Sequence, residues 1–432
     1  MSTDVKVGIS DIAIYLPRLK IDLETIIKKR ASESDGKILE KVLKRALEKT
    51  GVLSMHFPES WEDSVTMAAQ AALKLINRKR FNLKALRYLV SGTETTVDYS
   101  KPLSSYVIGI LKKAGISLPQ SISTFQTQHA CAGGTVALMA ISALLGFTQS
   151  SGESGIVLCS DIARYGKYTS AEMTQGAGAI ALLTETDPKL IELDLKTAGY
   201  SSKDVDDFFR PLGSEIAKVK GGFSVRCYME AMDSALVDLS SRSGKTPKEM
   251  LTSADMYALH VPYPKLPTNT MEYLLGKYVE MDKEAIEKIL KEKGFYEMTA
   301  PASKSGNIYT GSMFMSLAFL LKNRYNQLGN AIVGKKILMG SYGSGNTMVF
   351  MSGIIAPSAP EVIKNWDLEE IWDHQKSTIQ DYESWIESNG KTSEQYASLL
   401  ESKRSSIQPD MFFLDRIRED GYREYSYSSQ HS

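Results

Sequence analysis

A cysteine at the head of an apolar helix is the first residue of this sequence that could do chemistry. The stretch "QHACAGGTVALMAISALLGF" (residues 128–147) places Cys131 just before Gly133 and Gly134, and apolar residues follow. A thiol at a helix N-terminus faces unpaired backbone N–H groups and the positive end of the helix dipole, which favour the thiolate. The glycines lack Cβ atoms, so a substrate or another backbone can approach closely. The pattern predicts a nucleophile, although most free cysteines are small buried hydrophobic residues.

Three loops hold residues that could serve a nucleophilic cysteine. Glu94 in "SGTET" and His260 in "LHVPYPK" each follow an apolar strand, at the edge where ligand sites of α/β sheets gather. Asn307 in "SGNIYTGS" precedes an apolar helix. Each also has an ordinary structural explanation, namely a solvated glutamate, a core histidine and a helix cap. The other cysteines, Cys159 in an apolar strand and Cys227 in a helix, are predicted to be core residues.

The elements that must position these residues alternate along the chain. Short apolar runs followed by longer helical patterns indicate an α/β protein, and 432 residues are too many for one small core. Residues 360–405 are predicted to be helical and the closing "SYSSQHS" disordered. The expected strands lie within residues 7–17, 86–95, 155–163, 176–185, 190–200, 256–266 and 335–356, and the expected helices within 62–76, 128–147, 224–240 and 305–321.

Composition excludes several classes of protein. The 51 basic residues equal the 51 acidic ones, so neither a nucleic acid nor a membrane surface is expected as a partner. The first residues lack the pattern of a secretory signal, and no apolar run approaches the roughly 20 residues of a membrane-spanning helix. Three scattered cysteines and five distant histidines argue against a disulfide framework and a metal centre, and they fit a reducing cytoplasm.

Taken together, these motifs resemble the 3-hydroxy-3-methylglutaryl-CoA (HMG-CoA) synthase family of the thiolase superfamily. The resemblance covers roughly residues 5 to 425 in the family's order, and its specificity comes from the joint pattern. The matching segments are "VGISDIAIYLPR", "EDSVTMAAQAA", "GTET", "ACAGGTVAL", "TQGAGAIALL", "DDFFRPLG", "HVPYPK", "GNIYTGS", "SYGSGNTM" and "FFLDRIREDGYREY".

The resemblance implies a thiolase-like α/β fold. It comprises two related βαβαβ-type halves that form a five-layer αβαβα core, with a helical C-terminal region, and it assembles as a homodimer. The implied division is 1–186 for the N-terminal half with Glu94 and Cys131, 187–357 for the C-terminal half with His260 and Asn307, and 358–432 for a helical extension and tail.

The resemblance also assigns roles to individual residues. Cys131 is implied to accept the acyl group, Glu94 to act as general acid and base, and His260 to orient the second substrate. Ser341 in "SYGSG" is implied to lie beside the site, where a backbone N–H could join that of Cys131 in holding an oxyanion. The implied substrate-binding residues are Asn307, Ser341, Tyr309, Gly176 and Lys265, the last on coenzyme A phosphate or simply solvated.

The reaction implied by the resemblance joins two CoA thioesters. Cys131 takes the acetyl group of acetyl-CoA, the acetyl carbanion adds to acetoacetyl-CoA, and water releases HMG-CoA, a step of the mevalonate pathway to isoprenoid precursors. Coenzyme A is then only the handle of the substrates, and neither a cofactor nor a metal is expected. A glutamate that alternates between base and acid needs a raised pKa, so we expect Glu94 in mostly apolar surroundings.

Departures from the family pattern leave the acceptor open. His129 stands where asparagine is expected, Ala132 replaces a common aromatic residue, and Lys220 occupies a usually acidic position. The segment "TGVLSMHF" replaces a glycine-rich one. His129 is either a structural residue or a contributor beside the thiolate.

Three alternatives therefore remain. A β-branching relative from polyketide synthesis would act on acyl groups bound to a carrier protein, and the altered residues permit this. A plain ketosynthase or thiolase is disfavoured by "GTET" and "GNIYTGS". A non-catalytic interaction protein would bind without becoming acylated.

Overall fold

Nine strands form one mixed sheet in the part of the chain that the computed structural model describes, residues 5–33, 36–148, 152–373, 375–388 and 393–429. In spatial order they are β11 (Met256–Leu259), β12 (Lys336–Gly343), β13 (Thr347–Ile355), β8 (Ile191–Ser202), β1 (Val7–Tyr15), β7 (Gly176–Thr186), β6 (Ser154–Ala163), β4 (Leu86–Gly92) and β5 (Gln126–Thr127).

The two ends of this sheet repeat one arrangement. Strand β7 is antiparallel to β1 and β6, and β4 is parallel to β6. In the same way, β13 is antiparallel to β8 and β12, and β11 is parallel to β12. A short antiparallel pairing of β1 with β8, at Ile9 and Ile191, joins the two sets. We call them the N-terminal set (β1, β7, β6, β4, β5) and the C-terminal set (β8, β13, β12, β11).

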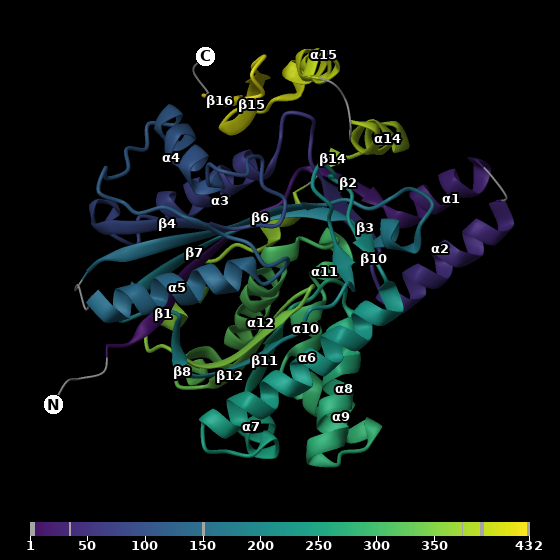
Figure 1. The fold of residues 1–432 in the computed structure, drawn as a ribbon. Helices are drawn as coiled ribbons and strands as arrows, with labels where there is room; N and C mark the ends of the chain where they lie inside the picture. Colours follow the sequence, from purple (N-terminus) through teal and green to yellow (C-terminus); the bar gives the residue numbers. More distant parts are fainter. Residues whose placement is uncertain (1–4, 34–35, 149–151, 374, 389–392, 430–432) are drawn as a thin grey trace.

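Helices cover both sets and separate them. Figure 1 shows α5 (Gly133–Thr148) and α12 (Ser312–Leu328) between the two sets of strands. Helices α3 (Ser64–Asn77) and α4 (Leu103–Lys113) lie outside the N-terminal set, and α6 (Gly221–Arg242) and α8 (Lys265–Val279) lie outside the C-terminal set. The predicted thiolase-like α/β class is confirmed, and the two sets share one sheet through β1 and β8.

Helix α3 shows how sequence sets these positions. Asp63 caps its start, because its carboxylate accepts the N–H groups of Val65 and Thr66 while the Thr66 hydroxyl accepts the Asp63 N–H. All of its residues except Lys74 and Asn77 are buried. A helix that is buried on nearly every side is a core helix, and here the sheet covers one side and β15 (Met411–Ile417) lies against another.

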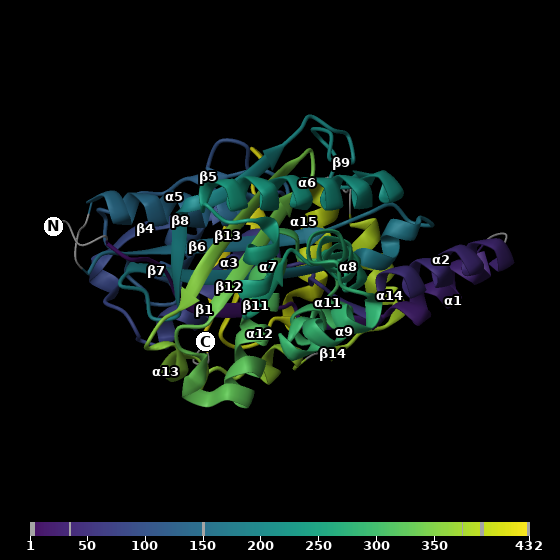
Figure 2. The same ribbon diagram turned by 90° about the horizontal axis from the view of Figure 1, so that it is seen from below.

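The remaining elements support the edges of the core. Helices α1 and α2 extend side by side from one edge of the molecule (Figure 2). The bounds of these two helices are Leu23–Glu33 (α1) and Gly36–Thr50 (α2). The other supporting elements are β2 (Leu19–Asp22), β3 (Ser54–Phe57), β9 (Phe208–Phe209), β10 (Lys218–Val219), α7 (Pro247–Ser253), α9 (Lys283–Glu292), α10 (Phe295–Thr299), α11 (Ala302–Ser305), α13 (Ala359–Ile363), β14 (Gln375–Lys376), α14 (Ile379–Glu387) and α15 (Ser393–Lys403).

The C-terminal region is helical at first and then ends in a hairpin, β15 (Met411–Ile417) with β16 (Arg423–Ser428). The prediction that "SYSSQHS" is disordered is therefore wrong for residues 426–428, and residues 430–432 lie outside the described part. The hairpin is held because Arg423 and the Tyr425 hydroxyl donate to Asp63 at 3.0 and 2.7 Å.

Helix α5 corrects another expectation. By length and composition, residues 130–148 could cross a membrane, although no such stretch was expected. In the structure 56% of this stretch is buried, and the helix packs against β4, β6 and β7. It is a core helix of the central layer.

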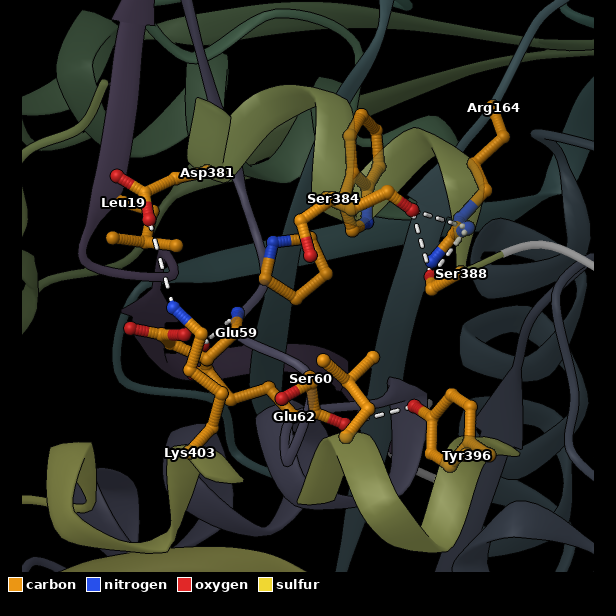
Figure 3. A pocket seen from close by; sticks show the side chains of 13 residues that line it. Leu19, Glu59, Ser60, Glu62, Arg164, Asp381, Ser384, Ser388, Tyr396 and Lys403 are labelled. Carbon is orange, nitrogen blue, oxygen red and sulfur yellow. Dashed lines mark hydrogen bonds and ion pairs between the residues drawn. The ribbon is translucent and has the colours of Figure 1, made fainter. Parts of the chain in front are cut away.

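A cleft that is partly open to solvent lies between α14, α15 and the segment before α3 (Figure 3). Polar side chains line much of it, among them Glu59, Glu62, Arg164, Asp381 and Lys403. None of the predicted catalytic residues lines it. Arg164 donates to the carbonyl of Trp385 at 3.1 Å, so α14 fixes the chain just beyond the end of β6.

Candidate active site

A tight turn presents Cys131 two residues before α5. The Ala132 N–H donates to the carbonyl of His129 at 3.0 Å, and Ala130 has a φ of 41°. The left-handed region costs a residue with a Cβ about 1 kcal/mol. The Thr127 hydroxyl donates to the Gly133 carbonyl at 2.6 Å and ties the turn to β5. The backbone strain thus falls on Ala130, directly before Cys131, and such strain is common at functional sites.

The glycines around this turn make room for neighbouring protein atoms. A Cβ on Gly92 would lie 2.3 Å from the backbone N of Gly134. A Cβ on Gly134 would lie 2.3 Å from the sulfur of Cys159. The predicted close approach is therefore present, and its partners are the end of β4 and the strand β6.

Cys131 and Glu94 form a buried pair. The thiol donates to Oε1 of Glu94 at 3.1 Å, and only 4% of the Glu94 side chain is exposed. Burial raises the pKa of Glu94 to about 7, with Asp161 adding to the rise and Arg210 opposing it. The apolar surroundings and raised pKa expected for Glu94 are thus present.

The charge state of Cys131 differs from the prediction. The helix terminus was expected to favour the thiolate, yet the pKa of the Cys131 thiol lies well above its ordinary value. Burial is the main cause, and the neighbouring Glu94 carboxylate adds to it. A dipole at one helix end is a modest effect compared with desolvation beside an anion, so the resting cysteine is a neutral hydrogen-bond donor.

Arg210 completes this pair from the segment after β9. Its Nη1 donates to the Glu94 carbonyl at 2.6 Å and lies 3.4 Å from Oε2 of Glu94. The guanidinium stands 5.7 Å from the ring centre of Tyr309 and 5.8 Å from that of Phe208. The apolar cluster around it consists of Cys131, Ala163, Tyr165, Phe208, Ala217 and Tyr309.

Asp161 links the loops of the two halves. Its Oδ1 accepts the N–H of Glu94 at 2.9 Å and the hydroxyls of Thr93 and Thr95 at 2.8 and 2.7 Å. Its Oδ2 accepts the N–H and the hydroxyl of Thr310, just before α12. The carboxylate is fully buried, so these donors replace its hydration.

His260 lies just beyond the end of β11 and is 2% exposed. Its Nδ1 is 2.7 Å from the hydroxyl of Ser312, the first residue of α12. Burial lowers the pKa of His260 to about 3, so the imidazole is neutral at physiological pH. A neutral imidazole has one donor and one acceptor nitrogen.

The predicted substrate-binding residues fall into two groups. Tyr309 lies in the Cys131 cluster, so the structure brings it to the site. Asn307 is buried and accepts the Tyr309 N–H at 2.9 Å, and a Cβ on Gly176 would lie 2.7 Å from the Asn307 carbonyl oxygen. Gly176 therefore makes room for the Asn307 backbone, which positions the Tyr309 turn.

Ser341 and Lys265 are placed by β12 and α8. Ser341 is buried within β12, and it is Gly343, two residues on, that packs against the turn, where a Cβ would lie 2.2 Å from the His129 carbonyl oxygen. Lys265 begins α8, and its Nζ donates to the Glu48 carbonyl at 2.6 Å. Burial lowers the pKa of His129, beside Cys131 in sequence.

Sequence reasoning missed Arg210 and Asp161. Arg210 stands inside the quoted segment "DDFFRPLG", and Asp161 is a lone charge in the apolar strand "GIVLCSDIA". A buried charge in an apolar run needs partners, which is the signal that could have identified Asp161.

Comparisons with known proteins agree with this geometry. The family model described as "Hydroxymethylglutaryl-coenzyme A synthase N terminal" matches residues 3–189, and its C-terminal counterpart matches 191–299 and 276–428. This chain belongs to the hydroxymethylglutaryl-coenzyme A synthase family. Its members condense and transfer acyl groups, so the chain is an enzyme of that type.

Individual relatives carry the same name. A hydroxymethylglutaryl-CoA synthase of Haloferax volcanii is 28% identical over 78% of this chain and 81% of its own length. The synthase of Saccharomyces cerevisiae is 26% identical over 97% of this chain and 89% of its own length.

Solved structures of the synthase family share the fold. "MvaS in complex with 3-hydroxy-3-methylglutaryl coenzyme A" has a TM-score of 0.82 and 30% identity, over 99% of this chain and 100% of that one. The curacin pathway HMG synthase with its holo donor-ACP has a TM-score of 0.81, over 98% of this chain and 100% of that one. At 21% identity the second likeness concerns the fold alone.

Proposed function

We propose that this chain condenses acetyl-CoA with acetoacetyl-CoA and water to give HMG-CoA and free CoA through an acetyl-cysteine. The observation that carries the proposal is the buried pair of Cys131 and Glu94, 3.1 Å apart, in a chain of the synthase family. The pair joins a nucleophile to a base whose pKa lies near 7.

The first step acetylates Cys131. As the sulfur attacks the carbonyl carbon of acetyl-CoA, its proton moves along the existing hydrogen bond to Glu94. The bond from the carbonyl carbon to the CoA sulfur breaks, and the proton leaves with CoA. Since both groups are buried, a proton shared between them avoids forming a thiolate beside an anion.

The second step forms the carbon–carbon bond. Glu94, again a carboxylate, removes a proton from the acetyl methyl group, and the carbanion attacks C3 of acetoacetyl-CoA. The new alkoxide then takes the proton from Glu94. Arg210 favours the carboxylate and burial favours the acid, so the balance of the two suits a group that must hold both forms.

His260 would position the acceptor. Its Nδ1 is engaged by Ser312, which leaves Nε2 for the ketone or alkoxide oxygen. A neutral imidazole can follow that oxygen through the reaction without changing charge. This supports the role in orienting the second substrate and argues against His260 as the main acid.

We also propose a homodimer, in the cytoplasm, that serves the mevalonate pathway. Strand β5 is an edge of the sheet, and α5 beside it exposes apolar side chains, with Phe147 86% and Leu144 40% exposed. Exposed apolar surface next to an open strand edge is a place for a second copy. Changing Phe147 to lysine should shift the mass in solution toward the monomer.

The first experiment is an intact mass, with peptide mapping, after brief exposure to acetyl-CoA alone. We expect one acetyl group on Cys131, and none on the Cys131→Ala variant. Acetoacetyl-CoA added next should release HMG-CoA. An unlabelled wild-type chain would exclude acetyl-CoA as donor and leave the carrier-bound donor or the non-catalytic alternative.

A further inference from the structure

Arg210 has one edge that the protein does not use. A guanidinium has five N–H groups, and Nη1 alone serves Glu94. In the described part of the chain, Nε and Nη2 are buried and have no hydrogen-bond partner. These two nitrogens form one edge of the planar guanidinium group. Their N–H bonds run parallel along this edge and match the two oxygens of one carboxylate.

The neighbouring aromatic rings do not satisfy this edge. Phe208 and Tyr309 face the guanidinium and attract its charge, but a ring face is not an in-plane acceptor for a pair of parallel N–H groups. Buried N–H groups of a charged side chain are costly to leave without an acceptor. The edge therefore calls for an oxygen ligand that the protein itself does not supply.

The proposed reaction forms a carboxylate beside this edge in its last step. Water attacks the carbonyl carbon of the acyl-Cys131 thioester, the carbon–sulfur bond breaks, and the water oxygen stays with the acyl group. One proton of the water returns to the sulfur and the other goes to Glu94. Neither starting thioester carries a carboxylate, so the product is the first ligand with an anionic end at Cys131.

Resting on the function proposed above, we propose that the Nε and Nη2 edge of Arg210 binds the carboxylate that hydrolysis releases from Cys131. Arg210 and Cys131 both contact the cluster of Tyr309 and Phe208, which places the cation next to the acyl group. The charged and titratable groups around it are Glu94, Asp161, Cys131, Tyr165 and Tyr309. Nη1 of Arg210 thus stays with Glu94, while Nε and Nη2 take the product carboxylate.

The test compares two ligands on enzymes that cannot turn over. In a Cys131→Ala background, calorimetry at pH 8 measures the affinity for HMG-CoA and for its analogue with a terminal carboxamide. We expect the enzyme with Arg210 to prefer the carboxylate by about 10- to 100-fold, the range for charge-assisted bidentate hydrogen bonds. Arg210→Gln should remove this preference, and Arg210→Lys should keep only about a tenth of it.

Acetoacetyl-CoA is the matched control, because it has no carboxylate. Its affinity should change by less than about threefold in the Arg210 variants, in contrast to the change for HMG-CoA. The same preference for the carboxylate with arginine and with glutamine would overturn the assignment. If both Arg210 variants fail to fold, the Cys131→Ala enzyme that keeps Arg210 still tests the assignment. A preference for the carboxylate below twofold in that enzyme would overturn the assignment.

This result separates from the proposed function. An unmodified chain that acetyl-CoA does not acetylate would refute the function. A chain that is acetylated on Cys131, and whose preference for a carboxylate does not depend on Arg210, keeps the function and loses this assignment.

Discussion

The two halves of the molecule use corresponding backbone positions for different chemistry. Each helix of the central layer follows a residue in the left-handed region, Ala130 (φ 41°) before α5 and Tyr309 (φ 45°) before α12. The next residue is Cys131 in one half and Thr310 in the other. One position therefore carries the nucleophile, and its counterpart carries a hydroxyl that anchors Asp161.

The residues that follow corresponding strands, β4 and β11, also differ, in this case in the pKa of their side chains. Glu94 follows β4 and has a pKa near 7, whereas His260 follows β11 and has a pKa near 3. Burial is the main cause at both sites, because it favours the neutral form. For an acid this moves the titration into the physiological range, and for a base it moves the titration out of it. One kind of environment makes Glu94 a proton carrier and His260 a fixed dipole.

Among these changes, removing the Glu94 carboxylate should cause the largest loss of activity. In Glu94→Ala we expect condensation to fall by about 10³-fold, the scale of general acid–base catalysis. Acetylation of Cys131 should persist at a reduced rate, because the thiol loses its proton acceptor but keeps its position. Steady-state assay and intact mass measure the two steps. Product formation near the wild-type rate would refute the role of Glu94.

The same residue should lower stability as the pH rises. The pKa of Glu94 is about 7 in the folded chain and 4.5 ordinarily, so the unfolded chain loses its proton first and stability falls between pH 4.5 and 7. The difference corresponds to about 3 kcal/mol. Glu94→Gln should therefore unfold at a higher urea concentration than wild type at pH 8, with little difference at pH 4.5. Equal midpoints at pH 8 would contradict the raised pKa.

Replacing His260, the residue with a fixed neutral charge state, should cause a smaller loss of activity that does not depend on pH. His260→Asn should lower kcat/KM by about 10²-fold, by a similar factor at pH 6 and pH 8, because the imidazole is neutral at both. Its effect on stability has the opposite slope to that of Glu94, since the contribution is full above pH 6.5 and lost as the pH falls toward 3. A loss that grows strongly at pH 6 would show that the protonated form matters.

Packing between α5 and β6 can be probed at Gly134, the second residue of α5. Gly134→Ala should destabilise the fold by about 2 kcal/mol, because the new Cβ meets the Cys159 sulfur at 2.3 Å. Cys159→Ala removes that sulfur and should restore part of the stability, although the Thr310 carbonyl oxygen at 3.1 Å remains close. Thermal unfolding of the single and double variants measures the coupling. Strictly additive effects would locate the strain elsewhere.

The smallest effect should come from the rim of the C-terminal half. Lys265 is exposed and already bound to the Glu48 carbonyl. If it also contacts coenzyme A phosphate, Lys265→Ala should raise KM by about two- to fivefold with kcat unchanged, and the effect should shrink in high salt. A KM that does not change would assign Lys265 to the anchoring of α8 alone.

The sequence predicted the positions of helices and strands better than it predicted the ionic forms of the site residues. Runs of apolar residues located β6, which is buried over most of its length, and α5, which is buried over half of it. Strand β16 escaped notice because its residues are mostly polar, and all six are half-buried, so it has no fully buried apolar face. The pairing of Cys131 with Glu94 followed from the family resemblance, since 37 residues separate them.

Charge states depend on neighbours that are distant in the sequence. Helix-end reasoning predicted a thiolate at Cys131, but the thiol pKa is raised by burial and by Glu94. Arg210, 116 residues from Glu94, is equally invisible to local patterns. Only the folded chain brings these groups together, so only the structure shows which ionic form each prefers.

Asp161 makes the two halves depend on each other over evolutionary time. One of its oxygens binds the loop of Glu94, and the other binds Thr310 at the head of α12. A substitution that shifts either loop therefore disturbs the other through a single carboxylate. Related as they are in architecture, the halves are not free to diverge separately at this point, and changes on one side have to be matched on the other.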